Sequence, residues 1–343
     1  MSAGRSTFYL TLLLAISLAV PGLALAERLP SRTYSMDDGL AHNRVKRIVQ
    51  DSHGFLWFCT ADGLSRFDGA RFTNYRVEDG LPAPSINDLL ETANGVYWIA
   101  TNTVGVVRFD LLHERHSTLY PISREPVTNR VNILYRDRAG ALWAGTDGGL
   151  FQLRDPSHDF TFHPAALGVP GHPDLQVQVW TLLDDANGGL WIGTKFGLVH
   201  RFADGHTAHF PLQPSGGDDA VRALVRDSAG SLWVGYAGGL IAFDPASSSP
   251  QTGRHYTTSD GLPTNTVLAL QQTPEGRLWI GTAQNGLAML DQRSGAPIRR
   301  YEVGHHFSDS VAGSITADRE DNLWLATQSA GAIKVSGLSL IHI

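Results

Sequence analysis

The sequence predicts an all-β fold: a seven-bladed β-propeller with four antiparallel strands in each blade and a ring closed by the N-terminal strand. Three observations predict it. Tryptophans recur at intervals of 41 to 48 residues, each stands in the same local frame, and the segments between them have the length of strands rather than helices. A period of about 40 to 50 residues is typical of a propeller, a solenoid or an array.

The frame around each tryptophan is an Asp-x-x-Gly turn, an apolar segment that contains the tryptophan, a short loop with glycine and a second apolar segment. Residues 51–69 carry the first copy, DSHGFLWFCTADGLSRFDG, and residues 185–202 carry another, DANGGLWIGTKFGLVHRF. Asp suits the first position of a type I turn and Gly the last. The tryptophans of the seven copies are Trp57, Trp98, Trp143, Trp191, Trp233, Trp279 and Trp324.

Each copy predicts four strands joined by hairpins, which is one propeller blade. An apolar segment precedes the turn, two more follow it, and a more polar fourth segment such as residues 72–75 ends the copy. The apolar strands lack a polar alternate face, so we expect blades to pack sheet against sheet. A solenoid is less favoured because its parallel strands need longer connections than these. The recurring tryptophans are therefore expected in the core.

The seventh copy leaves almost no chain for its fourth strand. The missing segment is found at the other end, because residues 34–40 (YSMDDGL) match residues 75–81 and 256–262, which follow the outer strands of two other copies. We therefore expect residues 32–35 to form the outer strand of the last blade. This pairing removes an open sheet edge between the first and last blades.

Both ends of the chain are expected to lie outside the blades. Residues 1–26 have a positive start at Arg5, an apolar run and a final Ala-Leu-Ala, the pattern of a cleavable signal peptide. This predicts a periplasmic or other extracytoplasmic protein whose propeller spans residues 27–336. Residues 337–343 fit no blade strand, and we expect them to mark the end of a fragment.

The composition of the chain excludes several classes of function. A net charge of -6 argues against a nucleic-acid binder, which needs a basic face for phosphates. The only cysteine, Cys59, excludes a disulfide within the chain and a zinc or iron–sulfur site built from cysteines. One Asp per turn serves turn geometry, and the histidines show no ligand spacing, so neither a metal nor a cofactor is expected. No nucleophile elbow or P-loop appears, and no catalytic residue is predicted.

Residues 39–69 carry a pattern that resembles the two-component regulator propeller repeat, and the resemblance extends over about residues 32–335. It implies the extracytoplasmic sensor region of a membrane-bound receptor. In that family the sensor continues into a membrane helix and a cytoplasmic output such as a histidine kinase or a diguanylate cyclase. None of these later parts is present here. The resemblance thus implies an N-terminal fragment that is not itself an enzyme, and that meets a membrane only through the missing part.

A ligand site is expected on the channel face built by the loops that enter each inner strand and the loops between the second and third strands. These loops carry polar residues that vary between copies, whereas the repeated frame serves the scaffold. Trp180 lies outside the tryptophan frame on an innermost strand and is a candidate for the channel. The candidate ligand residues are Arg44, Asp62, Asn102, Arg130, Asp147, Trp180, Lys195, Tyr236, Gln284 and Gln328.

Three functions remain open at this point: a sensor for a small molecule, a lyase that resembles the streptogramin lyase propellers, and a scaffold that binds only proteins. The resemblance favours the sensor and carbohydrate as the ligand class. A lyase needs a convergent acid and base at the channel mouth, and the repeats show none. A homodimer is expected through the full-length receptor.

Overall fold

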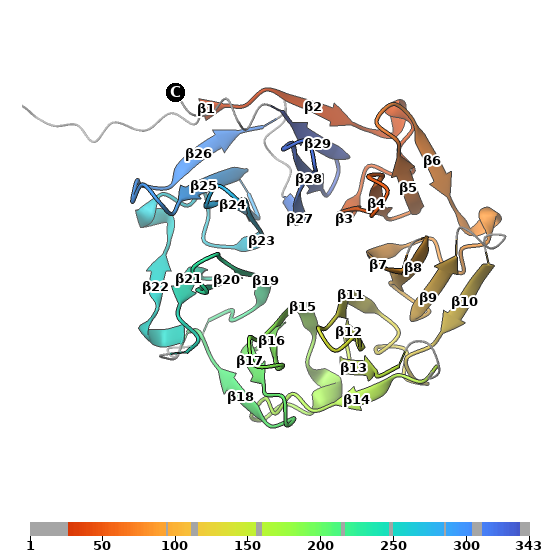
Figure 1. Cartoon of the computed structure of the whole chain (residues 1–343), viewed down its shortest axis with the longest axis horizontal. Coiled ribbons are helices and arrows are strands. Elements are labelled where there is room, and N and C mark those ends of the chain that lie inside the picture. Colours follow the sequence, from red (N-terminus) through yellow and green to blue (C-terminus); the bar gives the residue numbers. More distant parts are fainter. Residues whose placement is uncertain are drawn as a thin grey trace, which may run out of the picture.

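The computed structural model describes residues 27–93, 95–110, 116–155, 160–213, 217–246, 250–284, 286–303 and 311–336. They form seven sheets arranged as blades around a central channel, as Figure 1 shows, so the predicted seven-bladed β-propeller is confirmed. The expected signal peptide and the non-blade tail lie outside the described residues. The helical segments of the described part are single 3-10 turns, and none of them has the length and apolar character needed to cross a membrane.

The first strand of each blade lines the channel, and the second lies behind it (Figure 1). The inner strands are β3 (Val45–Gln50), β7 (Ile86–Ala93), β11 (Val131–Arg136), β15 (Val179–Asp184), β19 (Val221–Arg226), β23 (Val267–Gln272) and β27 (Val311–Ala317). The second strands are β4 (Leu56–Thr60), β8 (Val96–Thr101), β12 (Leu142–Thr146), β16 (Leu190–Thr194), β20 (Leu232–Tyr236), β24 (Arg277–Thr282) and β28 (Leu323–Thr327).

The third and fourth strands complete each blade toward the rim. The third strands are β5 (Gly63–Phe67), β9 (Val106–Asp110), β13 (Gly149–Leu153), β17 (Gly197–Arg201), β21 (Gly239–Phe243), β25 (Leu287–Asp291) and β29 (Ala332–Val335). The outer strands are β6 (Phe72–Tyr75), β10 (His116–Tyr120), β14 (His163–Ala165), β18 (Thr207–Phe210), β22 (Arg254–Tyr256), β26 (Arg299–Glu302) and, for the seventh blade, β2 (Ser31–Tyr34).

The N-terminal segment closes the ring as predicted, because β2 pairs antiparallel with β29. The strand begins and ends one residue earlier than expected. Ser35 instead caps the 3-10 turn η1 (Met36–Asp38), where its side chain accepts the N–H of Asp37. Ahead of it, the two-residue strand β1 (Glu27–Arg28) pairs in parallel with β26, so the first described residues contact blades six and seven. The N-terminal segment thus pairs with both the sixth and the seventh blade.

The 3-10 turn η1 has close counterparts in η2 (Val77–Asp79) and η5 (Thr258–Asp260). Each is followed by a glycine in the left-handed region, with φ between +99° and +111°. Each leads from an outer strand to the next inner strand, which confirms the match of the three Tyr-x-x-x-Asp-Gly-Leu segments. Two further 3-10 turns, η3 (Asp174–Gln176) and η4 (Pro250–Thr252), lie in other connections of the ring.

The seven frame tryptophans form the core, as predicted, with side chains at most 5% exposed. Trp57 packs with Leu89, Tyr97 and Ile99 of the next blade, so the core lies between adjacent sheets. Every residue of the second strand β4 is buried, which requires apolar residues on both faces. Cys59 lies in this strand, fully buried, and burial raises the pKa of its thiol well above the usual range.

Candidate functional site

The inner strands share a β-bulge near their first residue. In blade one Val45 pairs with Thr60 and Arg47 with Cys59, which leaves Lys46 without a partner in the ladder. A bulge of this kind re-aims a side chain. The same shift occurs at the same place in the next five inner strands. The residues at the bulges are Lys46, Asn87, Asn132, Trp180, Arg222 and Leu268.

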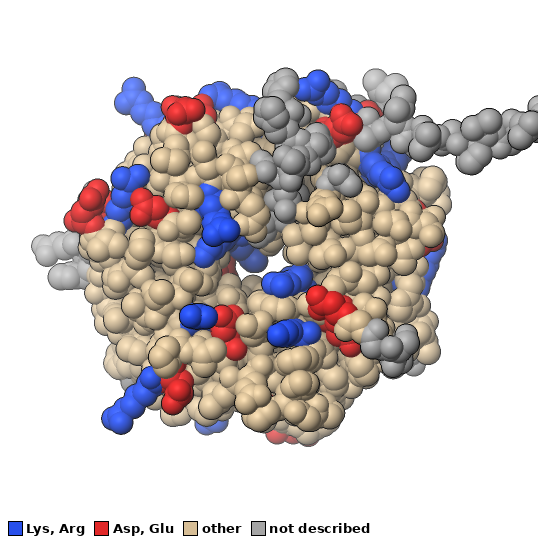
Figure 2. Space-filling model, turned by 180° about the vertical axis from the view of Figure 1, so that it is seen from behind, with Lys and Arg blue, Asp and Glu red and all other residues tan. Residues whose placement is uncertain are grey.

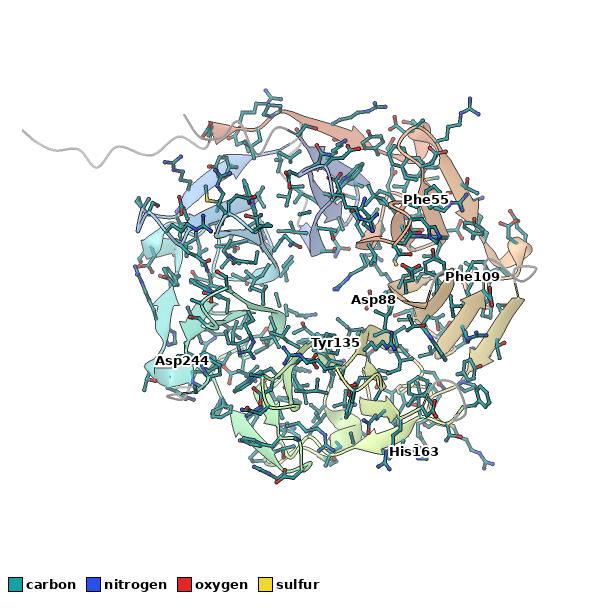
Figure 3. All side chains as sticks on the ribbon, viewed as in Figure 1. Phe55, Asp88, Phe109, Tyr135, His163 and Asp244 are labelled. Carbon is teal, nitrogen blue, oxygen red and sulfur yellow. The ribbon has the colours of Figure 1, made fainter. Side chains whose placement is uncertain are left out.

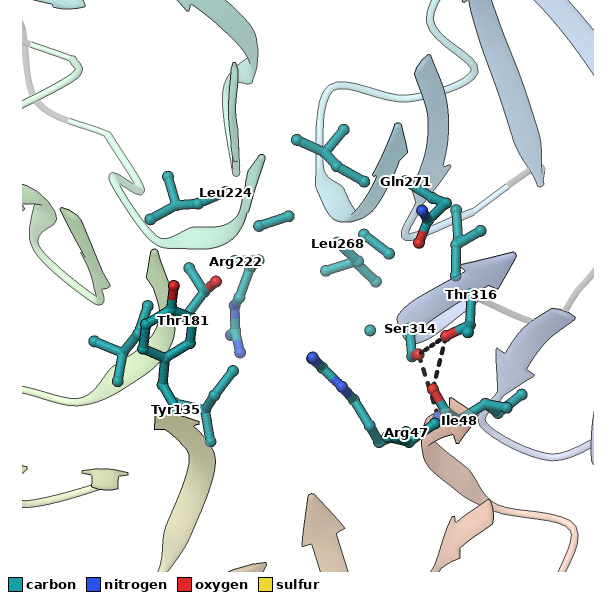
Figure 4. Close-up of a pocket in the computed structure, with 18 of the residues that line it drawn as sticks. Arg47, Ile48, Tyr135, Thr181, Arg222, Leu224, Leu268, Gln271, Ser314 and Thr316 are labelled. Atoms are coloured by element: carbon teal, nitrogen blue, oxygen red, sulfur yellow. Dashed lines mark hydrogen bonds between the residues drawn. The ribbon is translucent and has the colours of Figure 1, made fainter. Parts of the chain in front are cut away.

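These six residues line one cavity of about 410 Å³ at the channel mouth, on the side where the chain enters the inner strands. A second cavity of about 490 Å³ continues along the channel wall. Arg47, Arg222, Leu268 and Gly313 line both, so they stand where the mouth passes into the channel (Figure 4). The remaining residues of the mouth cavity are Arg44 and Gln328.

Blade one supplies three of the cations at the mouth. The Nε of Arg44 donates to Oε1 of Gln328 at 3.2 Å, across the joint between the first and last blades. Lys46 donates from Nζ to Oγ of Ser85 at 2.9 Å and to the amide oxygen of Asn87. Burial, together with the charge of Arg44, lowers the pKa of Lys46 to about 8. This part of the mouth is therefore positively charged and partly shielded from water.

Arg47 is tied to the wall by Asp88, whose Oδ1 lies 3.3 Å from its Nε. Asp88 also accepts the N–H of Leu89 and, across the blade boundary, the N–H of Leu134, both at 2.9 Å. Burial raises the pKa of this carboxyl, and Arg47 counteracts that effect. Figure 3 shows Asp88 and Tyr135 on the channel side of their blades and His163 and Asp244 at the outer rim.

Trp180 and Arg222 form the opposite side of the mouth, from blades four and five. The guanidinium carbon of Arg222 lies 3.4 Å from the centre of the Trp180 ring, a cation–π contact. Burial lowers the pKa of Arg222, which remains a cation at neutral pH. In Figure 4 the side chains of Arg47 and Arg222 point toward one another from opposite sides of the channel.

Two asparagines complete the ring of bulge residues and hold neighbouring inner strands together. The Nδ2 of Asn87 donates to the carbonyl of Val131 at 2.7 Å, and that of Asn132 donates to the carbonyl of Val179 at 3.1 Å. Both residues line the mouth cavity with the cations. Asn132 also donates to Asp147 at 3.0 Å. Each asparagine thus links the mouth cavity to the inner strand of the next blade.

The predicted site residues fall into two groups. Arg44, Trp180 and Gln328 line the mouth cavity. Asn102 stands directly behind it, since its Oδ1 accepts from Asn87 at 3.3 Å. Arg130 and Asp147, whose charged groups lie 3.9 Å apart, reach it through Asn132. The structure thus brings six of the ten predicted residues to the mouth or its immediate support.

The other four predicted residues do not line this cavity. Asp62 pairs with Arg76 at 3.6 Å. Lys195 is exposed, with its Nζ 5.6 Å from the centre of the Phe196 ring. Tyr236 is only 5% exposed and packs in the core, where burial raises the pKa of its hydroxyl. Gln284 is exposed, and its carbonyl accepts from Thr282.

Sequence reasoning missed Lys46, Arg47, Asn87, Asn132 and Arg222. A signal for the bulge residues was present, because each stands eleven residues before a frame tryptophan. That column of the repeat reads Lys, Asn, Asn, Trp, Arg, Leu and Gly, whereas the residue before it is Val, Ile or Ala in every copy. A position that varies between the repeats, while the residue before it stays apolar, indicates a side chain that does not pack in the core.

The face of the molecule shown in Figure 2 has lysine and arginine side chains around the central opening. Among the described residues that line the mouth cavity, four are cations and none is a carboxylate. Acidic groups lie nearby: Asp88 pairs with Arg47, and Asp147 pairs with Arg130 and accepts from Asn132. Over the described ranges no three His, Cys, Asp or Glu side chains gather as a metal site requires.

The fold and this mouth define a β-propeller with a polar, cationic cavity at one end of its channel. The family model for the two-component regulator propeller matches residues 39–62, 80–103, 174–196 and 261–284. Four of the seven blades therefore carry a segment that matches this repeat, as the sequence resemblance predicted. No curated protein matches the sequence.

Solved structures with the same architecture include extracellular domains of hybrid two-component systems and a lyase. The chain is similar to the extracellular domain of a hybrid two-component system from B. thetaiotaomicron, with 26% identity and a TM-score of 0.73 over 90% of this chain and 42% of that one. A second such domain from that organism gives 19% identity and a TM-score of 0.71, over 90% and 40%. This chain thus spans about two fifths of the length of those domains.

Virginiamycin B lyase from Staphylococcus aureus, solved as a catalytically inactive variant with quinupristin, shares 14% identity. Its TM-score is 0.71, over 91% of this chain and 99% of that one. This likeness shows the fold alone.

Proposed function

We propose that this chain is the extracytoplasmic sensor propeller of a two-component-type receptor and that it binds a small polar ligand at the channel mouth. One observation carries the proposal: an inner-strand position that varies between repeats is a bulge in six blades, and those six side chains converge on one cavity. A scaffold alone has no need to differ at that position. A ligand that touches several blades at once requires it.

The likeness to the extracellular domain of a hybrid two-component system supports the role of sensor. The leader-like residues 1–26 support export to the periplasm. In this proposal the chain is the N-terminal portion of a receptor that continues to a membrane helix and a histidine kinase or diguanylate cyclase. The receptor acts as a dimer. The sequence that follows in the gene tests this part directly, and a continuation without a membrane helix would refute it.

The mouth has the chemistry to recognise a carbohydrate or another polar small molecule. Arginine and asparagine side chains supply donors in fixed positions, and Trp180 supplies an aromatic surface. Ligand pockets combine apolar and aromatic surface with a small number of precisely placed polar groups. Because Asn87 and Asn132 bind neighbouring inner strands, a ligand that rearranges them also acts on the joints between blades. In this proposal, ligand binding at the mouth changes the contacts between neighbouring blades.

The test is a thermal-shift screen of the purified chain against polar small molecules, including neutral and charged sugars, followed by calorimetry of any ligand found. We expect Trp180→Ala to abolish the shift and Arg71→Gln to leave it intact, because Arg71 is exposed in the β5–β6 turn. A ligand whose affinity both variants retain would place the site elsewhere. Cleavage of quinupristin by the chain would favour the lyase instead.

A further inference from the structure

We infer that the mouth cavity selects a small polyanion, a molecule with at least two carboxylate, phosphate or sulfate groups that lie between blade one and blade five. The inference rests on the proposed function, because it names the ligand class of the same cavity. It goes beyond that function, since a sensor for neutral sugars needs no cluster of cations.

The first argument is the concentration of charge. Arg44, Lys46, Arg47 and Arg222 line one cavity of about 410 Å³, although the chain as a whole carries a net charge of -6. The sequence holds few lysines, and one of them stands at a bulge that turns it into this cavity. Like charges placed close together repel, and a bound anion removes that repulsion. The charge of the mouth cavity therefore favours a negatively charged ligand.

The second argument is that the nearby carboxylates do not neutralise the mouth. Asp88 is buried in the wall, where Arg47 binds it through Nε, so that the end of the guanidinium group extends into the channel (Figure 4). Asp147 is held by Arg130 and Asn132. Within the part of the chain that the structure describes, no carboxylate forms an ion pair within 4.0 Å of the Arg222 guanidinium, although Asp218 and Asp147 act on its charge from a longer distance. These cations retain donors for a ligand.

The third argument is the arrangement of the cations. Arg44, Lys46 and Arg47 come from the beginning of blade one, whereas Arg222 comes from blade five and rests on Trp180 (Figure 1). Figure 4 shows Arg47 and Arg222 reaching toward one another from opposite sides of the channel. A ligand between them meets donors at both ends. Arg47 is already paired with Asp88, which leaves Arg44 and Lys46 on one side and Arg222 on the other. Two anionic groups match this division of the charge.

The lowered pKa of Lys46 agrees with this geometry. Its causes are burial and the neighbouring Arg44, and the negative charge of a bound anion offsets both effects by favouring the ammonium form. Charge-assisted hydrogen bonds of arginine to carboxylate or phosphate are roughly twice as strong as neutral ones. The predicted ligand therefore gains most of its binding free energy from the cations whose charge is least favourable in the free protein.

The experiment is calorimetric titration of the full chain with citrate, pyrophosphate and a disulfated disaccharide, with maltose as the neutral probe. At least one anion should bind with a Kd well below about 1 mM. Its affinity should fall about tenfold to a hundredfold in Arg222→Gln and in Arg44→Gln, and stay unchanged in Arg71→Gln. Raising the salt concentration from about 0.05 to about 0.5 M should also weaken the binding of the anion to the natural chain. The anion that binds best shows whether the ligand carries carboxylate, phosphate or sulfate groups.

Two outcomes overturn the inference, and they differ in what they say of the proposed function. If none of the anions binds while maltose does, and Trp180→Ala abolishes maltose binding, the sensor proposal stands and the polyanion is wrong. If an anion binds with the same affinity in Arg222→Gln, Arg44→Gln and Trp180→Ala, the mouth is not the site and both fail. The thermal midpoint of each variant shows whether the fold is retained.

Discussion

The indole Nε1 of Trp57 donates a 2.8 Å hydrogen bond to Oδ2 of Asp51, six residues earlier in the same blade. The other carboxylate oxygen, Oδ1, accepts the backbone N–H groups of His53 and Phe55. One side chain therefore closes the turn and fixes the tryptophan. The same pairing joins Asp to Trp in blades three, five and seven, at Asp137–Trp143, Asp227–Trp233 and Asp318–Trp324.

Removing the Asp51 carboxylate should destabilise the chain more than removing its counterpart in blade three. Asp51 Oδ2 also accepts the hydroxyl of Tyr97 from the next blade at 2.8 Å, whereas Leu190 takes the place of that tyrosine beside Asp137. Asp51→Ala leaves two buried donors unpaired and should cost about 2–4 kcal/mol, against about 1–3 for Asp137→Ala. Urea unfolding of both variants measures this. Equal losses would show that Tyr97 contributes nothing through Asp51.

Blade four breaks this pairing and predicts a dependence of stability on pH. There Asp185 faces Nε2 of His200 at 3.1 Å, and the His200 ring stacks on Trp191 at 4.0 Å. Burial lowers the pKa of His200, Asp185 opposes the shift, and His206 and Arg226 add to it. A proton therefore binds this histidine more readily in the unfolded chain. Its neutral form contributes stability that is complete above about pH 6.5 and is lost as the pH falls through the lower folded pKa.

The measurement is the urea midpoint of the natural chain and of His200→Gln at about pH 7.5 and about pH 5.5. The natural chain should lose more stability on acidification than the variant, because the remaining histidines titrate in both. Should the natural chain instead gain stability relative to the variant, a charged pair between His200 and Asp185 would outweigh burial.

Closure of the ring depends on a glycine as well as on β2. Gly331 has φ +91°, and a Cβ there would lie 2.0 Å from the carbonyl oxygen of Tyr34, the last residue of β2. Gly63 meets Tyr75 in the same way in blade one, at 2.3 Å. Each glycine→Ala change should cost at least about 1–2 kcal/mol from the backbone conformation alone. Removing residues 27–34 should itself lower the urea midpoint, since Tyr34 packs on Phe67 and Trp324.

A double-mutant comparison isolates the closing contact. In the chain that lacks residues 27–34, the steric part of the Gly331→Ala effect should disappear, because its partner Tyr34 is gone. The effect of Gly63→Ala should remain. Urea midpoints of six chains measure this: the intact and the truncated chain, each unchanged, with Gly331→Ala or with Gly63→Ala. If the truncated chain unfolds at the same midpoint as the intact one, β2 does not hold the ring together.

The fold could be predicted because its cause is repeated. Each blade buries the same tryptophan and closes with the same turn, so seven copies reinforce one pattern. For the site, the sequence predicted the correct face of the propeller but not most of the side chains that line the cavity. The bulges that turn Lys46 and Arg222 into the mouth arise from the pairing of two strands, which no single segment reveals. Tyr236 shows the reverse, since the end of its strand directs the ring into the core.

The last prediction concerns the pH dependence of anion binding. Lys46 is the titratable cation of the mouth near neutral pH, with its pKa lowered to about 8, whereas the three arginines keep their charge. Below about pH 8 the ammonium group attracts the anion, and above it the neutral amine does not. Affinity for the anion that binds best in the titrations should therefore decline from about pH 7 to about pH 9.5, by up to about tenfold. The pKa of Lys46 in the free protein sets where the decline begins, near pH 8, and the higher pKa in the complex sets where it levels off. Lys46→Arg should keep the high affinity at both pH values, and Lys46→Met should show the low affinity at both. A decline that persists unchanged in Lys46→Arg would assign the titration to another group and remove Lys46 from the site.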